Sequence, residues 1–234
     1  MRSRLVEKVK STMLKVIGND EVEKTVTHII GLGLSFDHEP EEHNYGSAVL
    51  ILSDAILSVR RNYKVVVRPI INRIQHHKLH EKSLEQLVHL IDERGPQNLM
   101  DLWQYQDKER VVRLRSLSQK FIDLRAKLEV HDDLDLLRRW AHSAVPEDSK
   151  AFGIKGVGIA TFQYLRILSG VDTVKPDVHL QQAVKDAIGR QCSDFDLIRL
   201  IEATARQMEI PARKLDYAIW EYYSDKARAT SKCA

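Results

Sequence analysis

The chain has 234 residues, of which 43% are hydrophobic and 29% charged, and its formal net charge is +3. This length can bury a sizeable core in one large domain or in two small lobes. Its two cysteines, Cys192 and Cys233, give no disulfide framework, no CxxC zinc site and no four-cysteine iron–sulfur cluster. No apolar run approaches the roughly 20 residues that span a bilayer, and the N-terminus does not read as a secretory signal. We therefore expect a cytoplasmic protein that does not bind membranes.

Hydrophobic periodicity predicts helices along almost the whole chain, without an alternating strand pattern of useful length. The acidic loop at residues 36–46 marks the expected boundary between an N-terminal arm and the main body. The apolar run from Val49 to Ser58 predicts a helix. Tyr63, Val66, Ile70 and Ile74 recur at helical spacing and predict a second helix, strained by Pro69.

The later helices have clearer boundary signals. Ser83 and Gln86 occupy the positions of a capping box, and the helix that they begin is expected to stop at Gly95-Pro96. Apolar periodicity predicts further helices at residues 111–128, 134–140, 194–207 and 212–226.

Gly156, Val157 and Gly158 separate a short helix predicted at residues 149–154 from a longer one at 159–169. Glycines allow the chain to turn sharply there, which leaves backbone amides pointing outward beside the positive end of a helix dipole. Such amides form a phosphate site, and Lys155 adds a positive charge at its edge. The alternative is a tight helical hairpin without a ligand.

An acidic residue, Asp177, follows Lys175 and Pro176 at the predicted start of another helix. An acid in the first turn of a helix is stabilised by the helix dipole, so its role can be purely structural. Its position downstream of the glycine hairpin favours a functional role.

Together, these segments resemble the helix-hairpin-helix motif of the base-excision DNA glycosylases related to endonuclease III. That superfamily carries a hairpin of the form L-P-G-V-G and, further along, an essential aspartate that opens the next helix, often as V-D-x-H. Residues 154–158 (IKGVG) and 176–179 (PDVH) stand in these two places. Residues 52–63 resemble the first barrel helix of the family, so the resemblance covers about residues 50–185.

The resemblance implies an all-α fold with two helical lobes and a DNA cleft between them. Residues 47–168 would form a six-helix barrel lobe that ends in the helix-hairpin-helix motif. Residues 1–46 and 169–234 would form the second lobe, with Asp177 at the lip of the cleft.

The implied activity is that of a DNA glycosylase, which flips a damaged, mispaired or modified base out of the duplex and excises it. Asp177 would be the catalytic carboxylate, because bond cleavage develops oxocarbenium character on the sugar. Bifunctional relatives carry a nucleophilic lysine two residues after the last hairpin glycine, where this chain has Ala160. We therefore expect a monofunctional enzyme, although Lys175 remains an alternative nucleophile or, more simply, a phosphate contact.

The expected partner is double-stranded DNA with a damaged or non-canonical base, bound by a monomer. At the hairpin, Lys155, Gly156, Val157 and Gly158 are the candidate DNA-binding residues. Arg60 aligns with the family residue that fills the space of the extruded base, with Arg61 and Asn62 as neighbours. A simple phosphate contact is the alternative for both arginines.

No cofactor is expected to be required, and no iron–sulfur cluster is expected. Relatives often hold a monovalent cation through main-chain carbonyls of the hairpin, which here belong to Phe152, Ile154 and Val157. Metal spacing at His76, His77 and His80 is a weaker candidate because no acid or cysteine completes the set.

The remaining candidates are weaker still. His38 and His43 lie among acids in a loop. Asp54 is a possible second catalytic acid, although the acid of some relatives aligns nearer Ile56. Aromatic residues at helical spacing are expected in the core rather than as base platforms: Trp140, Trp220, Tyr222 and Tyr223. Two functions of other classes stay open, a non-catalytic helix-hairpin-helix module that binds DNA or abasic sites, and a helical protein that binds a protein partner.

Overall fold

The computed structural model describes residues 18–37 and 45–232, and within these ranges it contains helices, turns and loops but no strand. The all-α class is therefore confirmed for this part of the chain. The chain divides into two compact units, one of residues 36–177 and the other of the segments that precede and follow it. The lobe boundaries that the resemblance implies, at residues 47 and 168, both lie inside the continuous unit.

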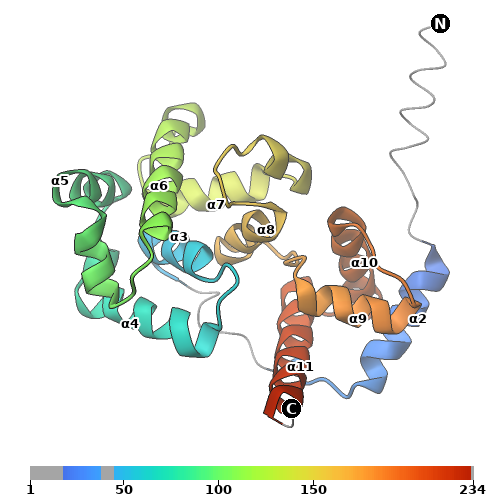
Figure 1. Cartoon of the computed structure of the whole chain (residues 1–234). Coiled ribbons are helices and arrows are strands. Elements are labelled where there is room, and N and C mark those ends of the chain that lie inside the picture. Colours follow the sequence, from blue (N-terminus) through green and yellow to red (C-terminus); the bar gives the residue numbers. More distant parts are fainter. Residues whose placement is uncertain (1–17, 38–44, 233–234) are drawn as a thin grey trace, which may run out of the picture. The chain divides into compact units, whose positions relative to one another are not determined.

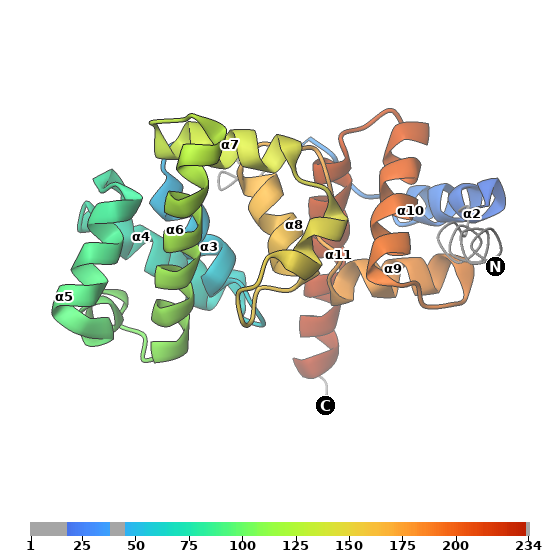
Figure 2. The ribbon, with the colours of Figure 1, turned by 90° about the horizontal axis from the view of Figure 1, so that it is seen from above.

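Within the described residues, the continuous unit contains six α-helices and three shorter helices, shown in Figures 1 and 2. The α-helices are α3 (Ala48–Leu57), α4 (Arg68–His76), α5 (Leu84–Trp103), α6 (Lys108–Leu128), α7 (Asp133–Ser143) and α8 (Ile159–Leu168). The shorter helices are η2 (Tyr63–Val67), η3 (Leu79–Glu81) and η4 (Pro146–Ala151).

Helix α3 is the centre of this unit. The helix expected from the apolar run is present, and all of its residues are buried. It packs against α6 and α8, and it also contacts α4, α5, α7 and η3. Its first turn is capped by Ser47, whose side chain accepts a hydrogen bond from the backbone amide of Leu50.

An aromatic cluster joins α6, α7 and α8 to the segment before the glycine hairpin. Its members are Phe121, Trp140, Phe152 and Phe162, and all are buried. Phe121 meets Trp140 edge to face at 4.9 Å between ring centroids, and Phe152 meets Phe162 in the same way at 5.2 Å. The prediction that Trp140 belongs to the core is confirmed. The cluster anchors Phe152, and with it the start of the hairpin, to the core.

The capping box of α5 is confirmed by both of its hydrogen bonds. The amide of Gln86 donates to Ser83 Oγ at 3.2 Å, and the amide of Ser83 donates to Gln86 Oε1 at 3.0 Å. The predicted end at Gly95-Pro96 is only partly right: the backbone breaks at Gly95, whose φ is 73°, but helical structure resumes and continues to Trp103. Proline is compatible with the first turn of a helix, because backbone amides in that turn have no hydrogen-bond partner within the helix.

Two other predicted helices differ in kind. The segment with Pro69 begins as a π-helix, η2, and Pro69 then lies in the first turn of α4, where it causes no internal strain. The short helix predicted at residues 149–154 is a 3₁₀ helix, η4, that starts earlier, at Pro146, and ends at Ala151. Pro146 begins this helix, whereas the preceding helix, α7, already ends at Ser143.

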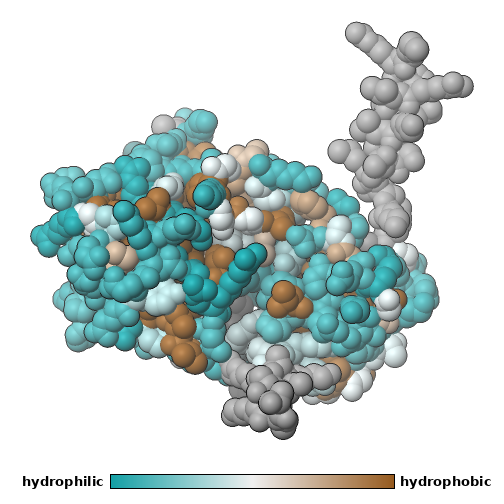
Figure 3. All heavy atoms as spheres, in the orientation of Figure 1, coloured by the Kyte–Doolittle hydropathy of each residue, from teal (hydrophilic) through white to brown (hydrophobic). Residues whose placement is uncertain are grey.

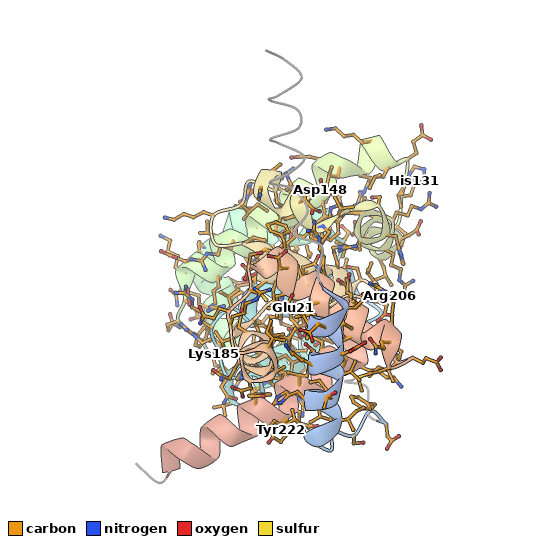
Figure 4. The ribbon with its side chains drawn as sticks, turned by 90° about the vertical axis from the view of Figure 1, so that its right-hand side faces the viewer. Glu21, His131, Asp148, Lys185, Arg206 and Tyr222 are labelled. Atoms are coloured by element: carbon orange, nitrogen blue, oxygen red, sulfur yellow. The ribbon has the colours of Figure 1, made fainter. Side chains whose placement is uncertain are left out.

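The second unit contains α2 (Asn19–Gly31), α9 (Val178–Ile188), α10 (Asp194–Gln207) and α11 (Ala212–Lys232). Helix α2 packs against α9 and α10, and its buried residues are Val22, Thr25 and Ile29. Figure 4 shows this unit with Glu21 on α2, Lys185 on α9 and Arg206 on α10 labelled. Arg190 ties the loop after α9 to α2, because its guanidinium lies 2.6 Å from a carboxylate oxygen of Glu21.

In the described ranges, no helix combines the length and the hydrophobicity that crossing a membrane requires. On the face of the molecule in Figure 3, hydrophilic side chains predominate and hydrophobic ones form small separate groups.

Candidate functional site

The glycine hairpin contains a tight turn whose geometry requires glycine. The amide of Val157 donates to the carbonyl of Ile154 at 3.0 Å, which closes a four-residue turn. Gly156 occupies the third position with φ of 86°, a conformation typical of a type II turn and strained for any residue with a side chain. The sharp turn expected from the sequence is therefore present at Gly156.

Beyond this turn, Gly158 immediately precedes α8. Its backbone is extended, with φ of −88° and ψ of −174°, and no side chain caps the first turn of α8. The first amides of a helix have no partner within it and lie at the positive end of the helix dipole. Lys155 lies exposed on the turn. This arrangement can bind an anion through backbone amides and one lysine.

A buried polar side chain holds the segment that leads to Asp177. The side-chain amide of Gln163, on α8, donates to Thr173 Oγ1 at 2.8 Å and to the carbonyl of Val174 at 3.3 Å. Arg166 donates to Gln163 Oε1 at 2.8 Å, which fixes the orientation of that amide. Helix α8 therefore begins directly after the hairpin. Through the buried side chain of Gln163, it also binds the chain segment that ends at Asp177.

Asp177 is the last residue of the continuous unit and directly precedes α9. Its amide donates to the carbonyl of Lys175 at 2.8 Å, so the chain makes a three-residue turn around Pro176. The positions of Lys175 and Asp177 are thus coupled through the backbone. The sequence placed Asp177 at the opening of a helix, and in the structure that helix begins at the next residue, Val178.

Asp54 is fully buried in α3 and lies at the centre of a group of hydroxyl donors. Its Oδ1 accepts hydrogen bonds from Ser58 at 2.7 Å and from Tyr164 at 3.1 Å. Its Oδ2 accepts from Tyr45 at 2.8 Å and from Tyr63 at 2.9 Å. We call these five residues the Asp54 cluster.

Burial raises the pKa of Asp54, whereas the hydrogen bonds from Ser58, Tyr45 and Tyr63 and the charge of Lys175 act in the opposite direction. The ammonium group of Lys175 lies 4.0 Å from the centroid of the Tyr164 ring. A cation in this position is attracted to the ring face. Lys175 and Asp54 therefore both contact Tyr164 in the structure, although the sequence analysis considered them separately.

The loop with Arg60 follows α3, and a buried arginine donates hydrogen bonds to its backbone. Arg110, on α6, donates to the carbonyl of Leu57 at 3.0 Å and to that of Val59 at 2.7 Å, and it also contacts the carbonyl of Ile56. Its Nε pairs with Asp107 at 2.9 Å. The guanidinium thereby satisfies carbonyls that the end of a helix leaves without partners.

Within that loop, Arg60 is exposed and has φ of 53°, which is uncommon for a residue other than glycine. Arg61 is also exposed, but its guanidinium already has a partner, since its Nε donates to the hydroxyl of Tyr105 at 2.6 Å. Asn62 caps η2 by accepting a hydrogen bond from the amide of Val65 at 3.1 Å. Among the three candidates, Arg60 is the one whose side chain best suits contact with a partner.

The proposed carbonyl ligands of a cation flank the turn. The carbonyl of Ile154 already accepts the amide of Val157, and a carbonyl oxygen keeps a second lone pair that a cation could use. Phe152 and Val157 are buried, so their backbones are held in place. The monovalent cation at these carbonyls stays a prediction.

The histidine candidates find no support as metal ligands. Among the described residues, no group of three or more His, Cys, Asp or Glu could hold a metal ion, which includes His76, His77 and His80. The rings of His76 and His77 pack edge to face at 5.1 Å. His38 and His43 lie outside the described residues.

Sequence reasoning missed Arg110, Gln163 and Tyr164, although a signal was present for one of them. Gln163 is a polar residue in a largely apolar stretch of a predicted helix, which is typical of a buried polar group with a specific partner. The carbonyls that Arg110 binds and the carboxylate that Tyr164 binds lie far along the chain, which no local pattern reveals.

Comparison with known proteins gives a family but no activity. The family model described as Domain of unknown function (DUF8548) matches residues 33–224. No curated protein and no solved structure matches the chain. Because the matched range covers most of the chain, the chain belongs to this family.

Proposed function

We propose that this member of the DUF8548 family is a monofunctional DNA glycosylase that hydrolyses the N-glycosidic bond of a damaged, mispaired or modified base. The observation that supports it best is the double role of α8. Its uncapped first turn follows the glycine hairpin, and Gln163 on its buried face holds the chain segment that ends at Asp177. An anion site and a carboxylate are therefore linked through one helix.

In this proposal the hairpin binds the DNA backbone. The amides around Gly156 and Gly158, with Lys155, receive a phosphate, and this contact positions the duplex without reading its sequence. Arg60 enters the space that the extruded base leaves, from a loop that Arg110 keeps rigid.

The reaction then takes place at the extruded nucleotide. The C1′–N bond breaks, and the base leaves with the electron pair of that bond and takes up a proton. The carboxylate of Asp177 stabilises the positive charge that develops on the sugar, and it accepts a proton from the water whose oxygen bonds to C1′. The products are the free base and an abasic site.

Water is the proposed nucleophile because the chain has Ala160 at the position where the bifunctional glycosylases that the hairpin resembles have lysine. A lysine nucleophile would form a Schiff base and lead to strand cleavage. Hydrolysis instead leaves the strand intact.

The experiment is a screen of duplexes that each carry one lesion, including uracil, alkylated purines and oxidised bases. We expect base release from at least one duplex, with no strand cleavage and no adduct trapped by borohydride. Asp177→Asn keeps the shape of the side chain but removes its charge, so it should lower the rate of base release by about a hundredfold or more. Duplex affinity should stay near that of the parent.

Asp172→Asn is the matched control, because Asp172 is an exposed acid on the same segment. It should release base at the parental rate. An Asp177→Asn variant as active as the parent would contradict the catalytic assignment. No release from any duplex, with binding retained, would favour the non-catalytic DNA-binding module. An adduct trapped by borohydride would show that an amine attacks the sugar, and Lys175 would be tested first.

A further inference from the structure

The Asp54 cluster has no role in the chemistry proposed above, yet it is an elaborate arrangement of polar groups in the core. From its geometry we infer that Asp54 is a positioning residue, which acts through Tyr164 to fix the ammonium group of Lys175 as a ligand for a DNA phosphate. The phosphate as ligand rests on the proposed function, whereas the link from Asp54 to Lys175 does not.

The first step is that Asp54 is fully saturated with donors. A carboxylate offers about four lone-pair positions to donors. Four hydroxyls fill them, from Tyr45 before α3, Ser58 after it, Tyr63 at the start of η2 and Tyr164 in α8. Asp54 is therefore a structural acceptor and not a general base that awaits a substrate proton. The hypothesis that Asp54 is a second catalytic acid therefore fits these hydrogen bonds poorly.

The second step is that the ring of Tyr164 is held at both ends. Its backbone belongs to the buried face of α8, and its hydroxyl donates to Asp54 at 3.1 Å. A phenol fixed in this way presents one defined face, and Lys175 Nζ lies 4.0 Å from the centroid of that ring.

The third step concerns what a fixed Lys175 can do. A lysine side chain is long and flexible, and ordering it on binding costs conformational entropy. The Tyr164 ring removes part of this cost in advance. A Schiff-base nucleophile must be a neutral amine, whereas an aromatic face and a nearby carboxylate both stabilise the ammonium ion. The surroundings of Lys175 therefore suit a cation that binds phosphate, and the turn at Pro176 keeps this cation close along the chain to Asp177.

The first test needs no DNA. The lysines are reductively methylated with ¹³C, and the Lys175 signal is identified by its loss in Lys175→Arg. A methyl group above an aromatic face resonates upfield, so the Lys175 signal should be shifted upfield in the parent. Tyr164→Leu should abolish this shift. Tyr164→Phe removes only the hydroxyl and should reduce the shift, and Asp54→Asn should have the same effect.

Tyr105→Phe is the matched control. It also removes one phenolic hydroxyl from this unit, but one that binds Arg61 instead of Asp54. The Lys175 signal should not change in it. If Tyr164→Phe leaves the Lys175 signal at its parental position, the positioning role of Asp54 is wrong. Because Tyr164→Phe deletes a single oxygen, this result can be read even if Asp54→Asn fails to fold.

The second test measures duplex affinity against salt concentration. Lys175→Gln should reduce the slope of log K against log salt by about 1, as the loss of one phosphate contact does. Tyr164→Leu should reduce it by a similar amount, and the double variant should lose no more than either single variant. An unchanged slope in Lys175→Gln would overturn the phosphate assignment. Failure of the lesion screen would contradict the glycosylase but would leave both of these measurements able to decide the role of Lys175.

Discussion

The guanidinium of Arg113 lies directly against Gly156. A Cβ atom placed on Gly156 would be 2.7 Å from Arg113 Nε and 2.8 Å from its Cζ, closer than real Cβ contacts come. Arg113 lies on α6 and pairs with Glu109 at 2.6 Å. The space that Gly156 leaves is thus occupied by an arginine, which brings a further positive charge to the hairpin turn.

Because of this contact and its backbone conformation, Gly156 should tolerate a side chain less well than Gly158. Gly156→Ala should lower the free energy of unfolding by about 1–2 kcal/mol, because φ of 86° is a left-handed conformation. Gly158→Ala should cost less, since nothing lies within 4 Å of its added Cβ and its backbone is extended. Urea unfolding of both variants checks this order.

A double variant distinguishes the two causes at Gly156. Arg113→Ala relieves the close contact but leaves the backbone conformation unchanged, so Arg113→Ala/Gly156→Ala should keep most of the loss seen in Gly156→Ala. Equal stability of the two single glycine variants would show that the turn at Gly156 is not strained by a side chain.

Arg110 should be among the most sensitive positions of α6. Its side chain is 4% exposed, and it donates to the carbonyls of Leu57 and Val59. Arg110→Met should lower the free energy of unfolding by about 3 kcal/mol, because it leaves buried acceptors and part of the charge of Asp107 without a partner. Urea or thermal unfolding provides the measurement.

Arg115→Met is the control on the same helix. Arg115 pairs with Asp92 at 2.7 Å, but its side chain is 37% exposed, so water replaces the lost interaction. Its stability should stay close to that of the parent. A loss for Arg115→Met as large as that for Arg110→Met would show that burial does not set the cost.

Asp54 predicts a specific dependence of stability on pH. Burial raises its pKa in the folded protein above the value of about 3.9 in the unfolded chain. Over this interval the folded state binds more protons than the unfolded state, so stability falls as pH rises. The parent's advantage over Asp54→Asn should therefore be largest near pH 4 and should decline as pH rises through the folded pKa.

The measurement is the free energy of unfolding of the parent and of Asp54→Asn in urea at several pH values from 4 upward. Taking the difference at each pH removes the titration of groups common to both proteins. If the advantage of the parent instead grew with pH, the four hydrogen bonds would outweigh burial and the pKa of Asp54 would be lowered.

Local sequence patterns predicted much of the fold. The apolar run at α3 and the capping box of α5 depend on residues a few positions apart, and both are present in the structure. The π-helix η2 was not predicted, because its residues follow the same apolar spacing as an α-helix. The helical segment after Gly95 was also not predicted. Proline is compatible with the first turn of a helix, so Pro96 does not by itself mark a helix end.

The candidate site was predictable only where its chemistry follows from adjacent residues. Gly156 was identified because a sharp turn requires glycine, and its φ agrees. The link between Asp54 and Tyr164 joins residues 110 positions apart, and the contact of Arg110 with Val59 joins residues 51 apart. Such pairs depend on how helices pack in three dimensions, which periodicity within one helix does not specify.

The division of the chain at residues 36 and 177 has a consequence during synthesis on the ribosome. The unit of residues 36–177 is continuous, so all of its helices have been made once Asp177 is added. Helix α2 is made earlier, but the helices against which it packs, α9 and α10, are made only after that unit. Its buried residues Val22 and Ile29 must remain without their native partners while the whole intervening unit is translated. The first described helix of this protein is thus among the last to reach its native contacts.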